Sequence, residues 1–253
     1  MTRNASVLLG VPVDRKSLET AVADAMSAID GRGEPIVFAC ANPHSLVAAH
    51  ADPLFRSALE EASIVVVDGI GVSIMAKIAG IDVAKRITGN DYFFAVMNAL
   101  EQRGGGRVFF FGSSQAVLDR IAARMPRDFP KVSLCGALSP PFGAWSAEEN
   151  ASMVERVNAA RPDVLWVGMT APKQERWVQD NRNRLRARVI GSIGAVFDFY
   201  AGTHPRAPQW MCDIGVEWLY RLAREPRRMW RRNFVSAPKF GALVLWHHVL
   251  HRR

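Results

Sequence analysis

The sequence lacks several features that mark common classes of protein. Its 253 residues include only three cysteines, Cys40, Cys135 and Cys212, which are far apart and odd in number. This count argues against a disulfide framework or a zinc site and fits a reducing compartment. No run of about 18 apolar residues occurs, so the sequence predicts no membrane-spanning helix. None of the histidines has the spacing of zinc ligands.

Three common nucleotide-binding motifs are also absent. No G-x-G-x-x-G follows the first predicted strand, which argues against a standard dinucleotide dehydrogenase. No G-x-x-x-x-G-K-[ST] is present, so a P-loop enzyme is not expected. No Asp-x-Asp pair occurs, so we do not expect a sugar-nucleotide enzyme that holds a divalent metal with that pair. We therefore predict neither a metal nor a bound cofactor.

The positive charge is concentrated at the C-terminal end. The net charge is +8, and residues 201–253 supply seven of these charges, with ten Lys/Arg against three Asp/Glu. The same segment contains four of the seven tryptophans, Trp210, Trp218, Trp230 and Trp246. This asymmetry predicts two units, a near-neutral body over residues 1–200 and a basic, helical appendage over residues 201–253.

Short apolar runs alternate with stretches of helical periodicity along the body. The runs are residues 36–39, 64–67, 108–111, 132–134, 164–167 and 189–193. Residues 6–13 are too short for a signal peptide and are predicted as a first strand, followed by a helix that Asp14 caps. Continuous apolar strands separated by helices predict an α/β fold, with a mostly parallel, Rossmann-like sheet covered by helices on both faces.

The turns that follow these strands define a candidate site. Ligands bind parallel sheets beyond the carboxyl ends of the strands, where this chain has residues 40–44, 68–71, 112–115, 168–175 and 194–198. Glycines such as Gly69 and Gly112 allow a ligand close to the backbone, and helix N-termini bind phosphate. The turns therefore suit a nucleotide diphosphate, although any single one could be an ordinary strand-to-helix connection.

Short motifs occur in a fixed order over residues 10–239. They are Asp-Gly-Ile-Gly at 68–71, Lys-Arg-Ile-Thr-Gly-Asn-Asp at 85–91, Pro-Lys-Gln-Glu at 172–175, Gly194 with Phe-Asp at 197–198, Ala-Gly at 201–202, Arg-Ala-Pro at 206–208, Glu-Trp-Leu-Tyr-Arg at 217–221 and Glu-Pro-Arg at 225–227. This ordered set resembles the WecG/TagA/CpsF glycosyltransferase family.

The resemblance implies an inverting, metal-independent transfer of a hexosyl or N-acetylhexosaminyl group. The implied donor is a UDP-sugar and the implied acceptor is a polyprenyl-diphosphate-linked saccharide, in the biosynthesis of cell-surface polysaccharide or exopolysaccharide. It also implies a cytoplasmic enzyme that binds peripherally to the anionic inner face of the plasma membrane through its C-terminal appendage, which completes the active site. The sugar, the acceptor, the linkage and the oligomeric state are left open.

The same resemblance makes Asp68 the candidate catalytic base. An inverting transfer needs one carboxylate to take the proton from the acceptor hydroxyl, and Asp68 directly follows a buried strand. A structural turn cap is the alternative role. The residues expected to line the donor and acceptor pocket with it are Asn42, Gly69, Arg86, Asn90, Asp91, Gly112, Lys173, Gln174 and Asp198.

Two of these side chains have a specific expected partner. Gln174 can donate to and accept from sugar hydroxyls or the uracil edge. Arg86 can pair with the diphosphate of the leaving UDP. The alternatives are that Arg86 and Lys173 are solvated charges and that Asp198 pairs with Arg206. Cys40 stands where the family often has Thr, so a hydroxyl contact at that place is left open.

The appendage carries a predicted basic stripe. Arg221, Arg224, Arg228 and Arg231/Arg232 recur at helical spacing, and Glu225-Pro226 is expected to break the helix. Arg206, Arg221 and Arg224 are predicted to bind substrate, and the stripe suits the diphosphate of a lipid carrier. Basic residues beside tryptophans also suit anionic headgroups. The alternative is a solvated helix that packs its tryptophans into the body.

Two other functions remain open from the residues alone. A nucleotide-dependent enzyme of another kind, such as a dehydrogenase or epimerase, is disfavoured by the missing glycine motif. A nucleic-acid-binding protein is suggested by the basic appendage, but it would need one groove of basic and stacking residues. Because the body is near neutral, we expect no nucleic-acid partner.

Overall fold

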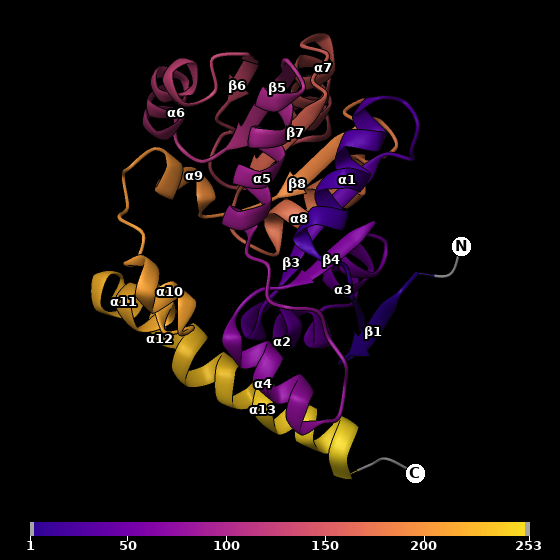
Figure 1. Cartoon of the computed structure of the whole chain (residues 1–253), viewed down its shortest axis with the longest axis vertical. Helices are drawn as coiled ribbons and strands as arrows, with labels where there is room; N and C mark the ends of the chain where they lie inside the picture. The colour runs from indigo at the N-terminus through magenta and orange to yellow at the C-terminus, as the bar shows by residue number, and fades with distance from the viewer. Residues whose placement is uncertain (1–2, 251–253) are drawn as a thin grey trace.

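A computed structural model describes residues 3–250 of the chain, with the side chains of Gln209, Asp213, Arg228, Val249 and Leu250 outside the described part. The predicted place of Arg228 in the basic stripe therefore lies outside the described residues. The central feature is a six-stranded parallel sheet in the order β4-β3-β8-β7-β5-β6 (Figure 1). Its strands are β3 (Ile36–Ala41), β4 (Ile64–Val67), β5 (Gly106–Gly112), β6 (Val132–Leu138), β7 (Val164–Gly168) and β8 (Val189–Ser192). The predicted parallel α/β fold is confirmed.

Helices cover both faces of this sheet. One face is covered by α1 (Leu18–Ile29), α5 (Gly89–Gln102), α6 (Gln115–Asp128) and α9 (Val196–Tyr200). The other face is covered by α2 (Pro43–Ala51), α3 (Pro53–Glu60) and α4 (Ile70–Ile78) beside β3 and β4, and by α7 (Ala147–Ala159) and α8 (Lys173–Asn181) beside β5 and β7. Because strands buried on both faces have no polar side, their sequences are continuous apolar runs.

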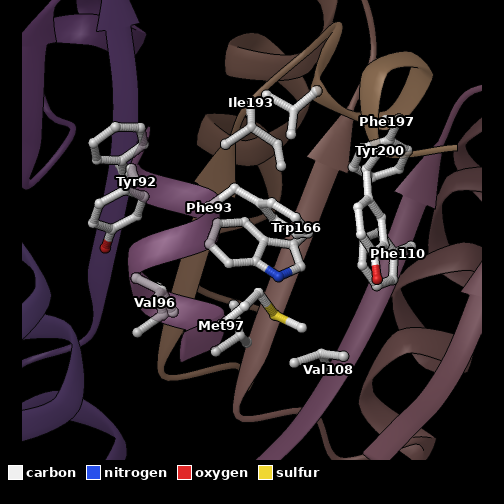
Figure 2. Packing of buried hydrophobic residues seen from close by; sticks show 14 of the residues in the cluster. Tyr92, Phe93, Val96, Met97, Val108, Phe110, Trp166, Ile193, Phe197 and Tyr200 are labelled. Carbon is white, nitrogen blue, oxygen red and sulfur yellow. The ribbon is translucent and has the colours of Figure 1, made fainter. Parts of the chain in front are cut away.

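Aromatic side chains fill the core on the α5 face, as Figure 2 shows. The ring of Trp166 on β7 meets the ring of Phe93 at a centroid distance of 5.2 Å, in an edge-to-face arrangement. Tyr92 stacks on Phe38 at 3.7 Å. A Cβ at Gly191 would lie 2.4 Å from the Trp166 ring, so the strand beside this indole has to carry glycine. Offset and edge-to-face pairs add about 0.5–1.5 kcal/mol each beyond the burial of their surface.

The N-terminal segment corrects two predictions. Residues 6–13 are not one strand, because β1 (Ala5–Leu8) and β2 (Val11–Asp14) form a separate antiparallel hairpin. Leu9 and Gly10 have φ values of 52° and 86°, the backbone of a tight two-residue hairpin turn. Asp14 does not cap α1, whose cap is Ser17. The Asp14 carboxylate instead accepts a hydrogen bond from the Val65 N–H at 2.6 Å.

The basic appendage is helical. It comprises α10 (Gln209–Asp213), α11 (Glu217–Arg224), α12 (Pro226–Arg231), η1 (Arg232–Ser236), α13 (Ala237–Val244) and η2 (Leu245–Leu250), where η marks a π-helical segment. The predicted break at Glu225-Pro226 separates α11 from α12. From α12 onward the segments form one long helix that runs past α2 and α4 (Figure 1). In the described part of the chain, no helix has the length and apolar character needed to cross a bilayer.

Two buried side chains of α13 attach this long helix to the body. Phe240 and Val244 belong to the same apolar core as Leu46 of α2 and Val72 of α4. Nearer the appendage's start, the His44 Nδ1 and the Ser236 Oγ are 2.8 Å apart, within hydrogen-bonding distance. The appendage is therefore packed on α2 and α4, the helices that follow β3 and β4.

Candidate active site

A cavity of about 360 Å³ opens beyond the carboxyl ends of β3, β4, β7 and β8. Its wall contains residues that directly follow these four neighbouring strands, including Asn42, Asp68, Met169 and Ile193. The other side of the cavity is built by the appendage, with Glu217, Trp218, Arg221, Met229, Arg232 and Asn233. Four of the five predicted turns therefore contribute to one site, and the appendage closes it, whereas residues 112–115 are not part of its wall.

The backbone around β4 fixes the position of Asp68. The Asp68 N–H donates to the Ala41 carbonyl at 2.8 Å and continues the β3–β4 ladder by one residue. The following Gly69 has φ of 101°, which turns the chain at once into α4 and would strain any other residue. Further along, the Ile87 N–H donates to the Val67 carbonyl at 2.9 Å. This bond brings the neighbouring Arg86 back to the end of the same strand.

The Asp68 carboxyl lies among charges of both signs. Burial and, to a smaller extent, the nearby Glu217 carboxylate raise its pKa to about 6, although Arg86 and Arg221 act in the opposite direction. A group with this pKa ionises close to neutral pH, as a general base requires. Glu217 and Arg221 belong to α11, so the appendage helps to set the acidity of a side chain in the body.

The arginines of the cavity have unused hydrogen-bond donors. The Arg86 Nη2 donates to the Cys212 carbonyl at 2.9 Å, and the Arg206 Nη2 lies 3.8 Å from the Asp91 carboxylate. Yet the Nε atoms of Arg206 and Arg221 are buried and have no hydrogen-bond partner among the described residues. Buried donors without partners are costly in a folded protein. Because Arg86, Arg206 and Arg221 all line the cavity, its wall is positively charged and suits an anionic ligand.

Gln174 and Glu175 form a second polar group in the cavity wall. The Gln174 Oε1 accepts from the Met169 N–H at 3.2 Å, and its Nε2 donates to the Glu175 Oε1 at 2.8 Å. These two bonds fix the orientation of the Gln174 amide. Glu175 is only 5% exposed, and burial raises its pKa to about 7. Its Oε2 has no hydrogen-bond partner within the described part of the chain.

The comparison with known protein families decides the identity of the chain. The model of the glycosyl transferase WecG/TagA/CpsF family matches residues 6–253. The chain belongs to this glycosyltransferase family. Its relatives include an N-acetylglucosaminyldiphosphoundecaprenol N-acetyl-β-D-mannosaminyltransferase of Bacillus spizizenii, which is 31% identical over 207 residues, covering 82% of this chain and 77% of the relative.

Proteins of the same name in two other bacteria are also similar. The Bacillus subtilis protein is 27% identical over 209 residues, covering 83% of this chain and 78% of its own length. The Staphylococcus aureus protein is 25% identical over 195 residues, covering 77% of this chain and 74% of its own length. The chain is therefore a glycosyltransferase related to enzymes of cell-envelope polysaccharide biosynthesis.

The predicted site residues of this glycosyltransferase divide into two groups. Those that line the cavity are Asn42, Asp68, Gly69, Arg86, Asn90, Gln174, Arg206 and Arg221. Those that the cavity wall does not include are Asp91, Gly112, Lys173, Asp198 and Arg224. The roles of both groups in binding and catalysis stay predictions.

Predicted site residues outside the cavity wall contact other parts of the protein. Lys173 lies over the Trp145 ring at 3.8 Å, with its Nζ donating to the Gly143 carbonyl at 2.9 Å. Asp91 caps α5, because its Oδ2 accepts from the Thr88 N–H at 2.9 Å. A Cβ at Gly112 would lie 2.5 Å from the Gly168 carbonyl oxygen, so this glycine allows β5 and β7 to approach. The Arg224 guanidinium lies over the Tyr220 ring at 5.7 Å, on the exposed side of α11.

Several cavity residues were absent from the predicted set. Glu175 and Glu217 stand inside motifs that carried the family resemblance, so their sequence signal was present but was not assigned to the site. His44 belongs to a predicted turn, and burial lowers its pKa. Cys40 lines the cavity and burial raises its pKa, so the thiol stays protonated where the family often has Thr. Within residues 3–250, no cluster of three or more metal-binding side chains is present.

Proposed function

We propose that this glycosyltransferase moves an N-acetylhexosaminyl group from a UDP-sugar to N-acetylglucosamine carried on polyprenyl diphosphate. The observation that carries the proposal is the placement of Asp68, which has a pKa of about 6, in one cavity with Arg206 and Arg221 of the appendage. A base for the acceptor and N–H groups for a leaving diphosphate are the two requirements of such a transfer. The acceptor class is taken from the names of the relatives.

The proposed reaction is a single displacement at the anomeric carbon. The acceptor hydroxyl attacks that carbon, and the Asp68 carboxylate takes the hydroxyl proton. The bond between the anomeric carbon and the β-phosphate oxygen breaks, and UDP leaves with the bonding electron pair. Attack from the face opposite the leaving group inverts the anomeric configuration. The relatives are named for a β-linked product, which inversion gives from an α-linked donor.

Protein groups take the place of a metal ion in this proposal. The guanidinium groups of Arg86, Arg206 and Arg221, which line the cavity, can donate to the oxygens of the diphosphate. The open N-terminus of α4, which has no side-chain cap and begins beside Asp68, provides further N–H groups. The absence of an Asp-x-Asp pair from the sequence agrees with this arrangement. The lipid-linked acceptor and the basic appendage favour a peripheral position on the inner face of the plasma membrane.

The test is a transfer assay with purified full-length protein. UDP-sugars are offered one at a time with a synthetic N-acetylglucosamine diphosphate that carries a short prenyl chain, and the product is identified by mass spectrometry. The one-bond carbon–proton coupling at the new anomeric centre reports its configuration. We expect one UDP-N-acetylhexosamine to react with inversion. Retention of configuration, or transfer only with donors other than UDP-sugars, would contradict the proposal.

A further inference from the structure

The helix α4 of the body has an exposed apolar row. Ile70, Ile74 and Ile78 are spaced by four residues, so they lie along one side of the helix. They are 36%, 51% and 56% exposed, whereas Val72 and Ala76 on the opposite side are buried in the core. A surface helix of a soluble protein normally carries polar residues on its outer side. The outer side of α4 is instead suited to an apolar environment.

This row is continuous with apolar surface on the appendage. Gly215, just before α11, lies against Ile70, since a Cβ at this glycine would be 2.9 Å from the Ile70 Cβ. The adjoining residues Ile214, Trp218 and Leu219 are exposed. On its other side α4 packs against α13 (Figure 1), and exposed Leu245 and Trp246 follow at the end of that helix. The exposed apolar residues of body and appendage therefore lie on neighbouring elements.

The apolar row also starts at the mouth of the cavity. Ile70 and Trp218 each line the cavity and are each partly exposed, so they belong to both surfaces. A ligand that reaches Asp68 past these two side chains passes directly over α4. Contiguous apolar patches on monomeric proteins mark sites of binding to proteins or membranes.

The charge of the neighbouring elements favours a membrane over a protein as the partner of this apolar surface. The side chains of Lys77 on α4, Arg224 on α11, Arg227 and Arg231 on α12 and Lys239 on α13 are all exposed. Residues 201–253 hold seven of the net +8 charges of the chain. Exposed apolar residues on helices that also carry Lys and Arg suit an anionic bilayer, where the apolar groups enter the acyl region and the cations stay with the headgroups.

We propose that α4 of the body, together with the appendage, binds an anionic phospholipid bilayer with Ile74 and Ile78 inserted into it. This places the cavity mouth at the membrane surface, and it rests on the proposed lipid-linked acceptor. A diphosphate at the headgroup level then meets the arginines of the cavity while its prenyl chain stays in the bilayer. The appendage alone is consequently not the whole membrane-binding surface.

The test compares flotation of full-length variants with phosphatidylcholine–phosphatidylglycerol vesicles. Ile74→Gln/Ile78→Gln removes the apolar row without adding charge, and Gln is a good helix former. We expect its partition coefficient to fall roughly 10- to 30-fold, because two half-exposed apolar side chains no longer enter the bilayer. The matched control is Phe142→Gln, since Phe142 is a 98% exposed apolar residue in the loop between β6 and α7 and does not belong to the row on α4. This control is expected to float like the parent.

Two further measurements separate the proposal from its alternatives. With a water-soluble acceptor the double variant is expected to react like the parent, whereas with a vesicle-embedded acceptor it reacts more slowly. Failure of the parent itself to transfer sugar would refute the proposed function and leave the flotation result unaffected. Unchanged flotation of the double variant would overturn the membrane proposal. If flotation is equal and light scattering shows that the parent is a dimer and the double variant a monomer, the proposal is also overturned. The apolar row would then be a contact between two copies of the chain.

Discussion

Replacing Asp68 by Asn removes one ionisable group at the end of β4 and keeps nearly the same shape. In the folded protein the pKa of Asp68 rises from its ordinary 3.8 to about 6, chiefly through burial. Because one pKa unit corresponds to about 1.4 kcal/mol, ionisation of Asp68 costs about 3 kcal/mol more in the folded protein than in the unfolded chain. Asn stays neutral at every pH and avoids this cost.

The sign of the effect on stability follows from the two pKa values. Below about pH 4 Asp68 is protonated in both states, so parent and variant are expected to have equal stability. Between pH 4 and pH 6 the unfolded chain releases its proton first, and the parent progressively loses stability relative to the variant. Above pH 6 the variant is expected to be more stable by about 3 kcal/mol at most. For a chain of this size that corresponds to a Tm higher by roughly 5–10 °C.

Activity is expected to change in the opposite direction. If Asp68 is the base, Asp68→Asn lowers kcat by roughly 10²–10⁴-fold. The parent rate should rise with pH up to about pH 6 and then level, because only the ionised carboxylate accepts the acceptor proton, and the variant should lack this rise. The control is Asp82→Asn, whose side chain is 78% exposed. Near-normal turnover by folded Asp68→Asn protein would refute the catalytic role, and an unchanged Tm at pH 7.5 would refute the electrostatic reasoning.

Three further predictions concern other parts of the site. Glu175→Gln should keep most of the activity, whereas Glu175→Ala, which leaves the Gln174 Nε2 without its acceptor, should lower kcat/KM roughly tenfold in steady-state assays. Transfer should survive EDTA, and a loss that Mg²⁺ or Mn²⁺ restores would disprove stabilisation of the leaving group by protein groups alone. Arg224→Glu/Arg231→Glu should weaken flotation with anionic vesicles more at low salt than at high salt, with UDP-sugar affinity in calorimetry little changed.

The sequence predicted the sheet well because its strands are buried on both faces. Each of the six strands of the sheet coincides with a short apolar run in the sequence. The strands have to be apolar because helices pack on both faces of the sheet. The N-terminal hairpin was missed because its turn, Leu9-Gly10, lies inside an apolar run and contains no polar residue. Only the positive φ values of these two residues reveal the reversal, and the glycine was the sole local signal.

The geometry of the α-helix explains why some predicted site residues line the cavity and their neighbours in the sequence do not. Successive residues of an α-helix point about 100° apart, so two adjacent residues of a motif do not face the same cavity. On α8, Gln174 faces the cavity and Lys173 turns toward Trp145. On α5, Asn90 lines the cavity while Asp91 caps the helix. A sequence motif suggests that all of its polar residues belong to the site, whereas only some of them face the cavity once the motif forms a helix.

The sequence patterns could not predict contacts between distant parts of the chain. Arg86 and the Cys212 carbonyl are 126 residues apart, and no local periodicity relates them. The same holds for Glu217, which approaches Asp68 only because the appendage packs on α2 and α4. The family resemblance implied that the appendage completes the site, and in the structure Glu217, Trp218 and Arg221 of the appendage line the cavity.

The cavity arginines also indicate how a diphosphate would be held. Arg86 and Arg206 already face protein oxygens, the Cys212 carbonyl and the Asp91 carboxylate, while the Nε atoms of Arg206 and Arg221 have no described partner. A diphosphate in the cavity would meet the guanidinium groups of Arg86 from the body and of Arg206 and Arg221 from the appendage. Because one anion then pairs with arginines of both parts, its binding also stabilises the packing of the appendage on the body. Binding of the donor and packing of the appendage on the body are on this reasoning thermodynamically linked, so each favours the other.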